Sequence, residues 1–234
     1  MHYFFATHIE NNTAQLDADE SLHLSKVLRL KPGDSIGVLD GSGTIFSALV
    51  KTVHAKASEA EIVGIAKEYN PKPYRLHVAM APTKMMERFE WFLEKAVEIG
   101  IDEISPILTE RCERSVVKMP RIENVVKAAM KQSLNGKTPR LNEACTLATF
   151  LKESSAQSRF IAHCAVGQKL LLPKAALQSP DILVCIGPEG DFTPREIAAA
   201  IDAGFAAVSL GESRLRAETA GIVSCAQVQA AWLI

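Results

Sequence analysis

The apolar and polar positions change their pattern at a proline-rich stretch, residues 70 to 73. Before it, short apolar runs of strand type alternate with turn residues: "HYFFA" at 2–6, "DSIGVLDGSGTIFSALVKTV" at 34–53 and "AEIVGIA" at 60–66. One segment, "SLHLSKVLRL" at 21–30, has a helical pattern. We therefore expect a small β-rich domain, a barrel, over residues 1–70, with a boundary at the two prolines.

After residue 73 strand-like runs alternate with helical ones. Strands are predicted at 74–81, 101–108, 159–166, 181–187 and 205–211, and helices at 87–100, 121–134, 193–204 and 218–234. The segment "TPREIAAAIDAG" carries a full helix-start signal, with Thr193 as N-cap, Pro194 in the first turn and Glu196 closing a capping box. The alternation predicts an α/β domain with a mostly parallel sheet over residues 73–234.

Three loops follow predicted strands of this sheet. They are "HCAVGQ" at 163–168, "GPEGDFT" at 187–193 and "LGESRLRAET" at 210–219. Ligands of such sheets bind outside the carboxyl ends of the strands, and glycines let the backbone approach them closely. The sequence thus predicts a ligand cradle made mostly of backbone, with Glu189, Arg216 and Glu218 as charged groups at its rim.

Composition narrows the class of protein. The five cysteines lack metal-ligand or disulfide spacing, so we expect no metal site. No apolar run is long enough for a membrane helix and the start lacks a signal pattern, which predicts a cytoplasmic protein.

The net charge is −1, yet residues 110–140 hold eight Lys or Arg against three Asp or Glu. That local excess of positive charge fits either a polyanion-facing surface or a solvated helix face.

The common nucleotide and hydrolase motifs are missing from the sequence. No G-x-G-x-x-G follows a strand, and "NGKT" at 135–138 offers only the end of a P-loop. A G-x-S-x-G elbow is also missing. Hydride transfer on a dinucleotide fold, NTP hydrolysis and serine hydrolysis are therefore disfavoured.

Four segments together resemble one family. They are "HLSKVLRLKPGDSIGVLDGSG" at 23–43, "KMMERFEWFLEKAVEIGIDEISPILTERC" at 84–112, "IGPEGDFTPREI" at 186–197 and "LGESRLRAETA" at 210–220. In this order and spacing they are similar to the RsmE family, the bacterial 16S rRNA (uracil-N3) methyltransferases of the SPOUT superfamily. The chain departs from the family pattern at Asp191, where a glycine is usual, at Asn135, where an arginine is usual, and at Tyr3.

The resemblance implies a fold and a set of partners. The fold would be a PUA-like β-barrel (1–70) followed by a SPOUT-type α/β domain (73–234) with a C-terminal trefoil knot. The cofactor would be S-adenosyl-L-methionine, bound in the knot. The partners would be a second copy of the chain and 16S rRNA within the 30S subunit, at uridine 1498 of that RNA, with neither membrane nor DNA involved.

The resemblance also assigns residues. The cofactor would be held by the three loops, through His163, Gly187, Pro188, Glu189, Gly190, Leu210, Gly211, Leu215 and Arg216. Basic side chains expected to contact RNA are Arg29, Lys84, Arg111, Arg114, Lys118, Arg121, Lys127 and Lys137. Either Lys137 or Arg140 would replace the family arginine that is missing at Asn135, or the contact with the target would differ.

Methylation at uridine N3 requires an unpaired base and the loss of a proton. A guanidinium can stabilise the resulting anion at a carbonyl oxygen, and a carboxylate can take the proton. The catalytic candidates are Arg216 for the first role and Glu218 for the second, with Glu189 as the alternative base. A helix-start ion pair is the ordinary explanation of the same charges. Two other functions stay open: a catalytically silent RNA-binding protein and a SPOUT methyltransferase acting on tRNA.

Overall fold

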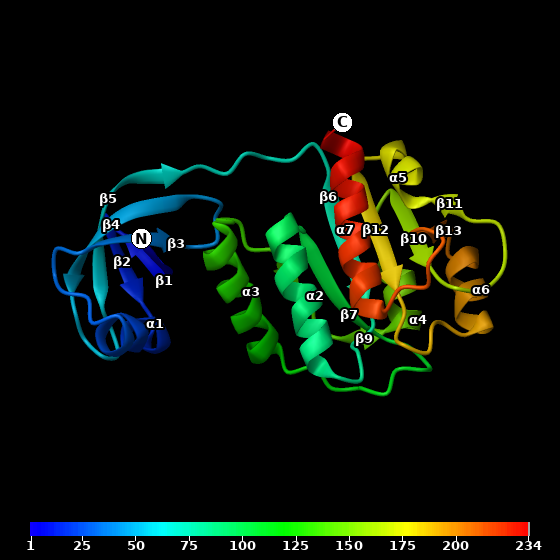
Figure 1. The fold of residues 1–234 in the computed structure, drawn as a ribbon, viewed down its shortest axis with the longest axis horizontal. Helices are drawn as coiled ribbons and strands as arrows, with labels where there is room; N and C mark the ends of the chain where they lie inside the picture. The colour runs from blue at the N-terminus through cyan, green and yellow to red at the C-terminus, as the bar shows by residue number, and fades with distance from the viewer. Residues whose placement is uncertain (234) are drawn as a thin grey trace. The chain divides into compact units, whose positions relative to one another are not determined.

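The computed structural model describes residues 1–233, and the chain forms two compact units. The first consists of Met1–Pro71 together with Lys127–Thr138. The second begins at Lys72, runs to Val126, and resumes at Pro139 for the rest of the chain (Figure 1). The sequence did not predict that residues 127–138 lie with the first unit.

The first unit is a closed five-stranded β-barrel with the strand order β1-β2-β5-β4-β3. Its strands are β1 (His2–Glu10), β2 (Thr13–Leu16), β3 (Ser35–Leu39), β4 (Ile45–Thr52) and β5 (Glu59–Lys67). Between β2 and β3 the chain makes α1 (Ala18–Leu22) and one π-helical turn, η1 (His23–Val27). Apolar side chains such as Phe4, Leu24 and Ile36 are fully buried inside the barrel, which confirms the predicted β-barrel.

The segment 127–138 joins the barrel through backbone contacts at glycines. The amide of Gly43 donates to the carbonyl of Gly136 over 3.1 Å, and the amide of Thr138 donates to the carbonyl of Gly41 over the same distance. A Cβ at Gly136 would lie 2.4 Å from the carbonyl oxygen of Gly43. Only a glycine therefore permits this approach, and it lies far from the barrel strands in the sequence.

The second unit is an α/β domain with a parallel sheet, ordered β11-β13-β10-β12-β6-β7-β8, and β9 pairs with β7 outside this path. The central strands are β6 (Arg75–Met80), β7 (Glu103–Leu108), β10 (Ser158–Ala162), β12 (Asp181–Ile186) and β13 (Ala206–Ser209). Short edge strands are β8 (Arg140–Leu141), β9 (Cys145–Thr146) and β11 (Leu170–Leu171). The predicted α/β class is confirmed.

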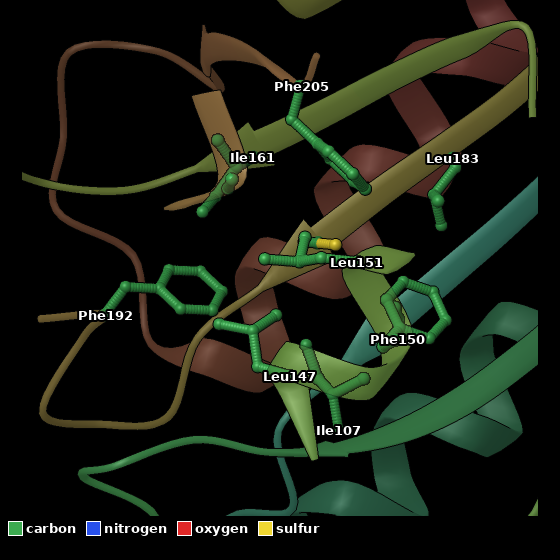
Figure 2. Close-up of a cluster of buried hydrophobic side chains, with 11 residues drawn as sticks. Ile107, Leu147, Phe150, Leu151, Ile161, Leu183, Phe192 and Phe205 are labelled. Carbon is green, nitrogen blue, oxygen red and sulfur yellow. The ribbon is translucent and has the colours of Figure 1, made fainter. Parts of the chain in front are cut away.

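Helices cover both faces of this sheet. They are α2 (Met86–Ile99), α4 (Leu147–Glu153), α5 (Leu172–Ala175), a 3-10 turn η2 (Ala176–Gln178), α6 (Pro194–Asp202) and α7 (Ala217–Leu233). The helix α3 (Met119–Ser133) begins in the second unit and ends in the first. Figure 2 shows Leu183 of β12 and Ile161 of β10 packed with α4 side chains on one face. Burial on both faces explains why these strands read as unbroken apolar runs.

On the other face α7 packs very closely against α2 and β6. A Cβ placed on Gly221 of α7 would lie 2.6 Å from the ring of Phe92 and 3.2 Å from the sulfur of Met80. The missing side chain lets the two helices approach each other there. This contact fixes the start of α7, and with it the loop that precedes α7.

Helix boundaries follow local chemistry where the sequence carries it. Thr193 accepts from the amide of Glu196 while the Glu196 side chain accepts from the amide of Thr193, which is the predicted capping box of α6. Gly100 ends α2 with φ of 96°.

The helices α4 and α5 were not predicted from the sequence. The trefoil knot stays a prediction. No helix within residues 1–233 is long and apolar enough to cross a membrane.

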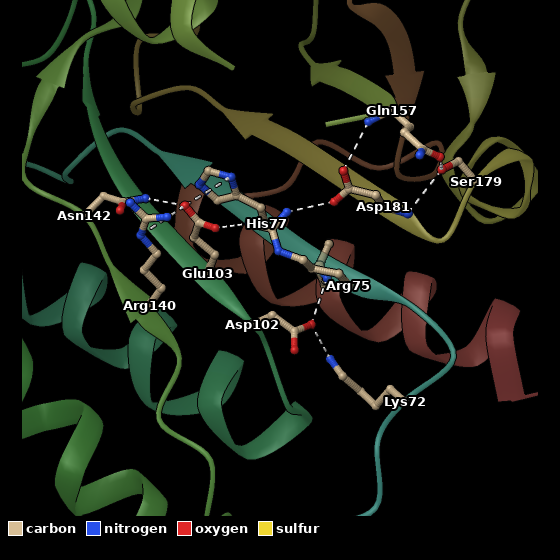
Figure 3. Close-up of polar contacts among 11 residues, drawn as sticks. Lys72, Arg75, His77, Asp102, Glu103, Arg140, Asn142, Gln157, Ser179 and Asp181 are labelled. Atoms are coloured by element: carbon tan, nitrogen blue, oxygen red, sulfur yellow. Dashed lines mark hydrogen bonds and ion pairs between the residues drawn. The ribbon is translucent and has the colours of Figure 1, made fainter. Parts of the chain in front are cut away.

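A buried polar cluster lies at the amino ends of β6, β7 and β12 (Figure 3). The imidazole of His77 lies 2.8 Å from the hydroxyl of Ser105, and Asn142 donates to both Ser105 and the carboxylate of Glu103. Arg75 pairs with Glu103 and also donates to Asp181 over 2.7 Å. The cluster thus ties together the ends of the strands opposite to the three predicted ligand loops.

We expect the stability of the protein to fall in mild acid because of His77. Burial lowers the pKa of His77 from 6.5 to about 4, while Glu103 acts in the opposite direction. The folded pKa lies below the unfolded one, so this stabilisation is complete above pH 6.5 and is lost as the pH falls towards 4. At 1.36 kcal/mol per pKa unit the loss is about 3 kcal/mol.

Urea unfolding between pH 7.5 and 4.5 measures this loss. In His77→Gln the side chain does not titrate, so the unfolding free energy should fall less steeply over this range than in the unchanged protein. His2→Gln, at an exposed position of β1, is the matched control and should keep the original slope. Parallel pH profiles for the protein and His77→Gln would show that His77 is not the group responsible.

Candidate active site

The three predicted loops meet at one edge of the parallel sheet. β10 ends at Ala162, β12 at Ile186 and β13 at Ser209, and their pairing registers bring these carboxyl ends side by side. The loops that follow, 163–169, 187–193 and 210–216, surround a cavity of about 1070 Å³. That volume is just above the range typical of small-molecule sites, about 300–1,000 Å³.

Residues with predicted site roles line this cavity to different extents. All nine predicted cofactor residues line it: His163, Gly187, Pro188, Glu189, Gly190, Leu210, Gly211, Leu215 and Arg216. Among the predicted RNA contacts only Arg111 does so. Of the three catalytic candidates, Arg216 and Glu189 line the cavity and Glu218 does not. The roles of these residues stay predictions.

Two glycines shape the wall of the cavity. Gly211 has φ of +138°, and a Cβ built on it would meet no protein atom within 4 Å, so the space beside it belongs to the cavity. At Gly187 a Cβ would lie 3.1 Å from the ring of the buried Phe192. A side chain at Gly211 would project into the cavity, and one at Gly187 would press against the core.

Arg216 and Arg214 present guanidinium groups at the cavity without a partner in residues 1–233. Both side chains are exposed, and neither makes a side-chain hydrogen bond or ion pair there. The carbonyl of Arg216 accepts the amide of Ala220 over 2.8 Å, so its backbone forms the start of α7. Arg216 is thus held in place by the helix while its charged group stays available to a ligand.

Glu218 lies in the first turn of α7, behind the cavity wall. Its side chain is buried, with one carboxylate oxygen 3.9 Å from Nε of Arg88 and the other, Oε2, without a hydrogen-bond partner in the described chain. A carboxylate in the first turn of a helix is favoured by the helix dipole. Glu218 therefore reaches the cavity through Arg88, which lines it.

Sequence reasoning assigned Arg88 no role in the site. A signal was present, because β6 ends at Met80 on the ligand edge of the sheet and α2 begins at Met86. A polar residue in the first turn of that helix falls at the same edge. What the sequence did not indicate was the pairing with Glu218, which comes from the far end of the chain.

Glu189 is held by the backbone of the loop before α2. Its two carboxylate oxygens accept from the amide of Lys84 over 3.1 and 3.4 Å. The Lys84 side chain pairs with Glu113 over 2.8 Å. Glu189 thus connects the loop 187–193 to the loop that leads into α2.

Three of the predicted RNA-binding arginines have partners inside this unit. Arg111 donates to the carbonyl of Gly190 over 2.8 Å, and Arg114 donates to the carbonyl of Lys84 over 3.1 Å. Arg121 pairs with Glu90. Arg111 therefore braces the loop 187–193 and Arg114 the loop that leads into α2, in addition to any contact with RNA.

The other predicted RNA contacts lie outside the cavity. In the barrel unit, the ammonium of Lys127 lies 5.7 Å from the ring centre of Phe5, and that of Lys137 lies 4.8 Å from the ring centre of Tyr69. Lys118 and Arg29 are exposed. None of these four side chains forms an ion pair within residues 1–233, so their charges are open to a polyanion.

His163 supplies the cavity with a neutral ring nitrogen. Its Nδ1 is buried without a hydrogen-bond partner in the described chain. Burial and the nearby Lys169 lower the pKa of His163, against the effect of Asp191. A buried unpaired polar atom in a site is satisfied when a ligand offers a matching group.

These features fit a ligand of nucleoside size with polar ends. Apolar side chains suited to a flat ring are Ile186, Phe192, Ile197, Val208, Leu210 and Leu215. Backbone amides and carbonyls of glycine-containing loops, with His163 Nδ1, provide hydrogen-bond partners. No group of three His, Cys, Asp or Glu side chains within residues 1–233 is arranged to hold a metal ion.

Family models match most of the chain. The model of the RNA methyltransferase domain matches residues 70–229, and that of the RNA methyltransferase PUA domain matches residues 16–63. The ribosomal RNA small subunit methyltransferase E of Synechocystis sp. is 32% identical over 225 residues, covering 93% of this chain and 73% of that protein. Its counterpart in Rickettsia conorii is 30% identical over 226 residues, covering 94% and 91%.

Solved structures of similar proteins superpose over nearly the whole chain. A probable rRNA-methyltransferase from Porphyromonas gingivalis has a TM-score of 0.87 at 38% identity and covers 100% of this chain and 99% of its own. A ribosomal RNA small subunit methyltransferase E from Neisseria gonorrhoeae, bound to S-adenosyl methionine, has a TM-score of 0.88 at 28% identity, covering 99% and 98%.

Proposed function

The chain belongs to the RNA methyltransferase family, within the group of ribosomal RNA small subunit methyltransferase E, and on that basis we propose that it methylates N3 of a uridine in 16S ribosomal RNA. The methyl donor is S-adenosylmethionine, and the target is uridine 1498 in the assembled 30S subunit. The observation that carries the proposal is the meeting of the three loops around one cavity.

The cavity supports a cofactor as well as an RNA target. An RNA-binding protein without catalysis has no use for glycine-lined loops around a space of about 1070 Å³. S-adenosylmethionine would be held by the loops 163–169, 187–193 and 210–216, with Gly187 and Gly211 leaving room for it. When bound, it supplies an electrophilic methyl group, so no metal is required.

Arg216 is the residue we assign to the reacting base. As the proton leaves uridine N3, negative charge develops on the ring carbonyl oxygens, and a guanidinium directed at one of them stabilises it. The Arg216 side chain lines the cavity and makes no ion pair within residues 1–233. A charge that is free of protein partners is available to the uracil ring.

Glu218 and Glu189 are the two candidates for the proton acceptor. Glu218 is buried beside Arg88, with one oxygen unpaired in the described chain, and Glu189 already accepts from the amide of Lys84. Glu218→Gln keeps size and hydrogen bonding but removes basicity. A rate loss that recovers at high pH, where uracil N3 ionises unaided, assigns Glu218 as the base. A small loss independent of pH assigns it to holding Arg88.

We also propose that the protein works as a homodimer through α7. This helix is mostly apolar, and Leu233 and Ala226 are exposed on it in the single chain. Exposed apolar side chains on a helix are buried when two copies meet about a two-fold axis. Light scattering at micromolar concentration should give twice the mass of the chain, and a mass of one chain would contradict the dimer.

The proposed function is tested directly on the RNA. Mass spectrometry of 16S rRNA from a strain that lacks this gene should show uridine 1498 without its methyl group. Complementation with the unchanged gene should restore the methylation. Purified protein should transfer labelled methyl groups to 30S subunits from that strain and not to subunits already modified.

Other outcomes of the same experiment identify the alternatives. Full methylation of 16S rRNA in the deletion strain, with a methyl group missing from tRNA, would show a tRNA enzyme. Unchanged RNA in the strain and no transfer in vitro would show a silent RNA-binding protein.

A further inference from the structure

Asp191 has an unusual backbone conformation at the edge of the cavity. It lies in the loop between β12 and α6 with φ of +60°, in the left-handed region. An L-residue there costs about 1 kcal/mol or more, with asparagine and aspartate the least penalised. Its amide donates to the carbonyl of Pro188 over 2.9 Å, and the next residue, Phe192, is buried in the core (Figure 2). The backbone is therefore held from both sides.

The carboxylate of Asp191 joins two of the three ligand loops. One oxygen, Oδ1, accepts from the amide of Phe192 over 2.8 Å, within its own loop. The other, Oδ2, accepts from the amide of Cys164 over 2.8 Å, in the loop after β10. Hydrogen bonds to a carboxylate are roughly twice as strong as neutral ones. The side chain thus connects residues 27 positions apart in the chain.

The hydrogen bond from Cys164 to Asp191 affects the position of His163, the residue before Cys164. His163 lines the cavity with a buried, unpartnered Nδ1, and residues 164–168 that follow are exposed. The Phe192 side of the connection is anchored in the core, whereas the loop 163–169 lies largely in solvent. Asp191, which is anchored beside Phe192, therefore holds the exposed loop 163–169 in place at the cavity. An exposed segment with few buried contacts needs such a contact to stay in one position.

We propose that Asp191 is a positioning residue for the cofactor cavity: its carboxylate clamps the loop 163–169 to the loop 187–193 and so holds His163 where a bound ligand can reach it. The proposal concerns the methyl-donor site of the proposed function, but the clamp itself is a property of the protein without ligand. It can therefore be tested without RNA and without turnover.

Asp191→Gly is the variant that isolates the clamp, because glycine adopts φ of +60° freely and removes only the carboxylate. In the full-length protein without ligand, the amide of Cys164 should exchange with solvent at least about tenfold faster than in the unchanged protein. The affinity for S-adenosylhomocysteine in calorimetry should fall about tenfold, as expected for one charge-assisted hydrogen bond. Asp191→Asn keeps one acceptor oxygen and should give intermediate values.

Glu212→Gln is the matched control for charge. Glu212 lines the same cavity, and its side chain makes no hydrogen bond or ion pair within residues 1–233, so the exchange of the Cys164 amide should not change in this variant. Unchanged exchange in Asp191→Gly would overturn the clamp. Faster exchange with unchanged affinity would overturn its role in the cavity. A failure of 16S rRNA methylation with both effects present would contradict the proposed function alone.

Discussion

Replacing Arg216 by alanine should reduce methyl transfer to 30S subunits about a hundred- to a thousandfold. The guanidinium lines the cavity and makes no ion pair within residues 1–233, so its charge is available to the anion that the proposed reaction would form on the uracil ring. Loss of one such contact in a desolvated site costs about 2.7–4 kcal/mol in the transition state. The measurement is the single-turnover rate at saturating methyl donor.

Arg195→Ala is the matched control for this experiment. Arg195 follows the cavity-lining Pro194 but does not line the cavity, and its exposed guanidinium faces Glu110 at 3.5 Å. Its removal takes away the same charge near the same site, and the rate should stay within about twofold, as expected for a surface pair. If Arg216→Ala retained nearly full activity, the arginines of this loop would be an ordinary charged rim.

Gly187→Val and Gly211→Val should each weaken the binding of S-adenosylmethionine at least about a hundredfold. At Gly211 the added side chain would project into the cavity, and φ of +138° strains any residue with a Cβ. At Gly187 a Cβ would already lie 3.1 Å from the ring of Phe192, so the valine methyl groups have to displace that ring or enter the cavity. Calorimetry with the methyl donor and its demethylated product measures both effects.

The control for these variants is Gly64→Val on β5 of the barrel. A Cβ at Gly64 would meet no atom within 4 Å, and its φ is not in the left-handed region. Ligand affinity should be unchanged in this variant. Thermal unfolding of all three variants separates loss of binding from loss of the fold. Normal affinity in both Gly187→Val and Gly211→Val would contradict our assignment of the loops.

Local patterns in the sequence were sufficient for the main elements. The unbroken apolar runs of β10 and β12 predicted buried parallel strands, and the structure confirms them as neighbours in the sheet. The capping box at Thr193 and the glycine at position 100 predicted the start of α6 and the end of α2, both confirmed. These signals involve residues only a few positions apart in the chain, so they can be recognised from the sequence alone.

The loops of the site could also be predicted from the sequence, because ligands of parallel sheets bind outside the carboxyl ends of the strands. The sequence grouped the loops 163–168, 187–193 and 210–219, and the structure brings residues of all three around one cavity. The same rule applied to β6 would have indicated Arg88. The burial of Glu218 behind the cavity wall could not be predicted from the sequence. The exposure of its side chain depends on which other elements pack over the first turn of α7.

The remaining features depend on contacts between distant residues. The hydrogen bond from Cys164 to Asp191, the ion pair of Arg88 with Glu218 and the docking of residues 127–138 on the barrel all join positions far apart in the sequence. Periodicity and capping describe only neighbours along the chain and do not specify such pairs. The sequence determined the central strands, most of the long helices and the loops that surround the cavity. The tertiary structure alone decided which charges meet there, because the free energy of a charge depends on its burial and its partner.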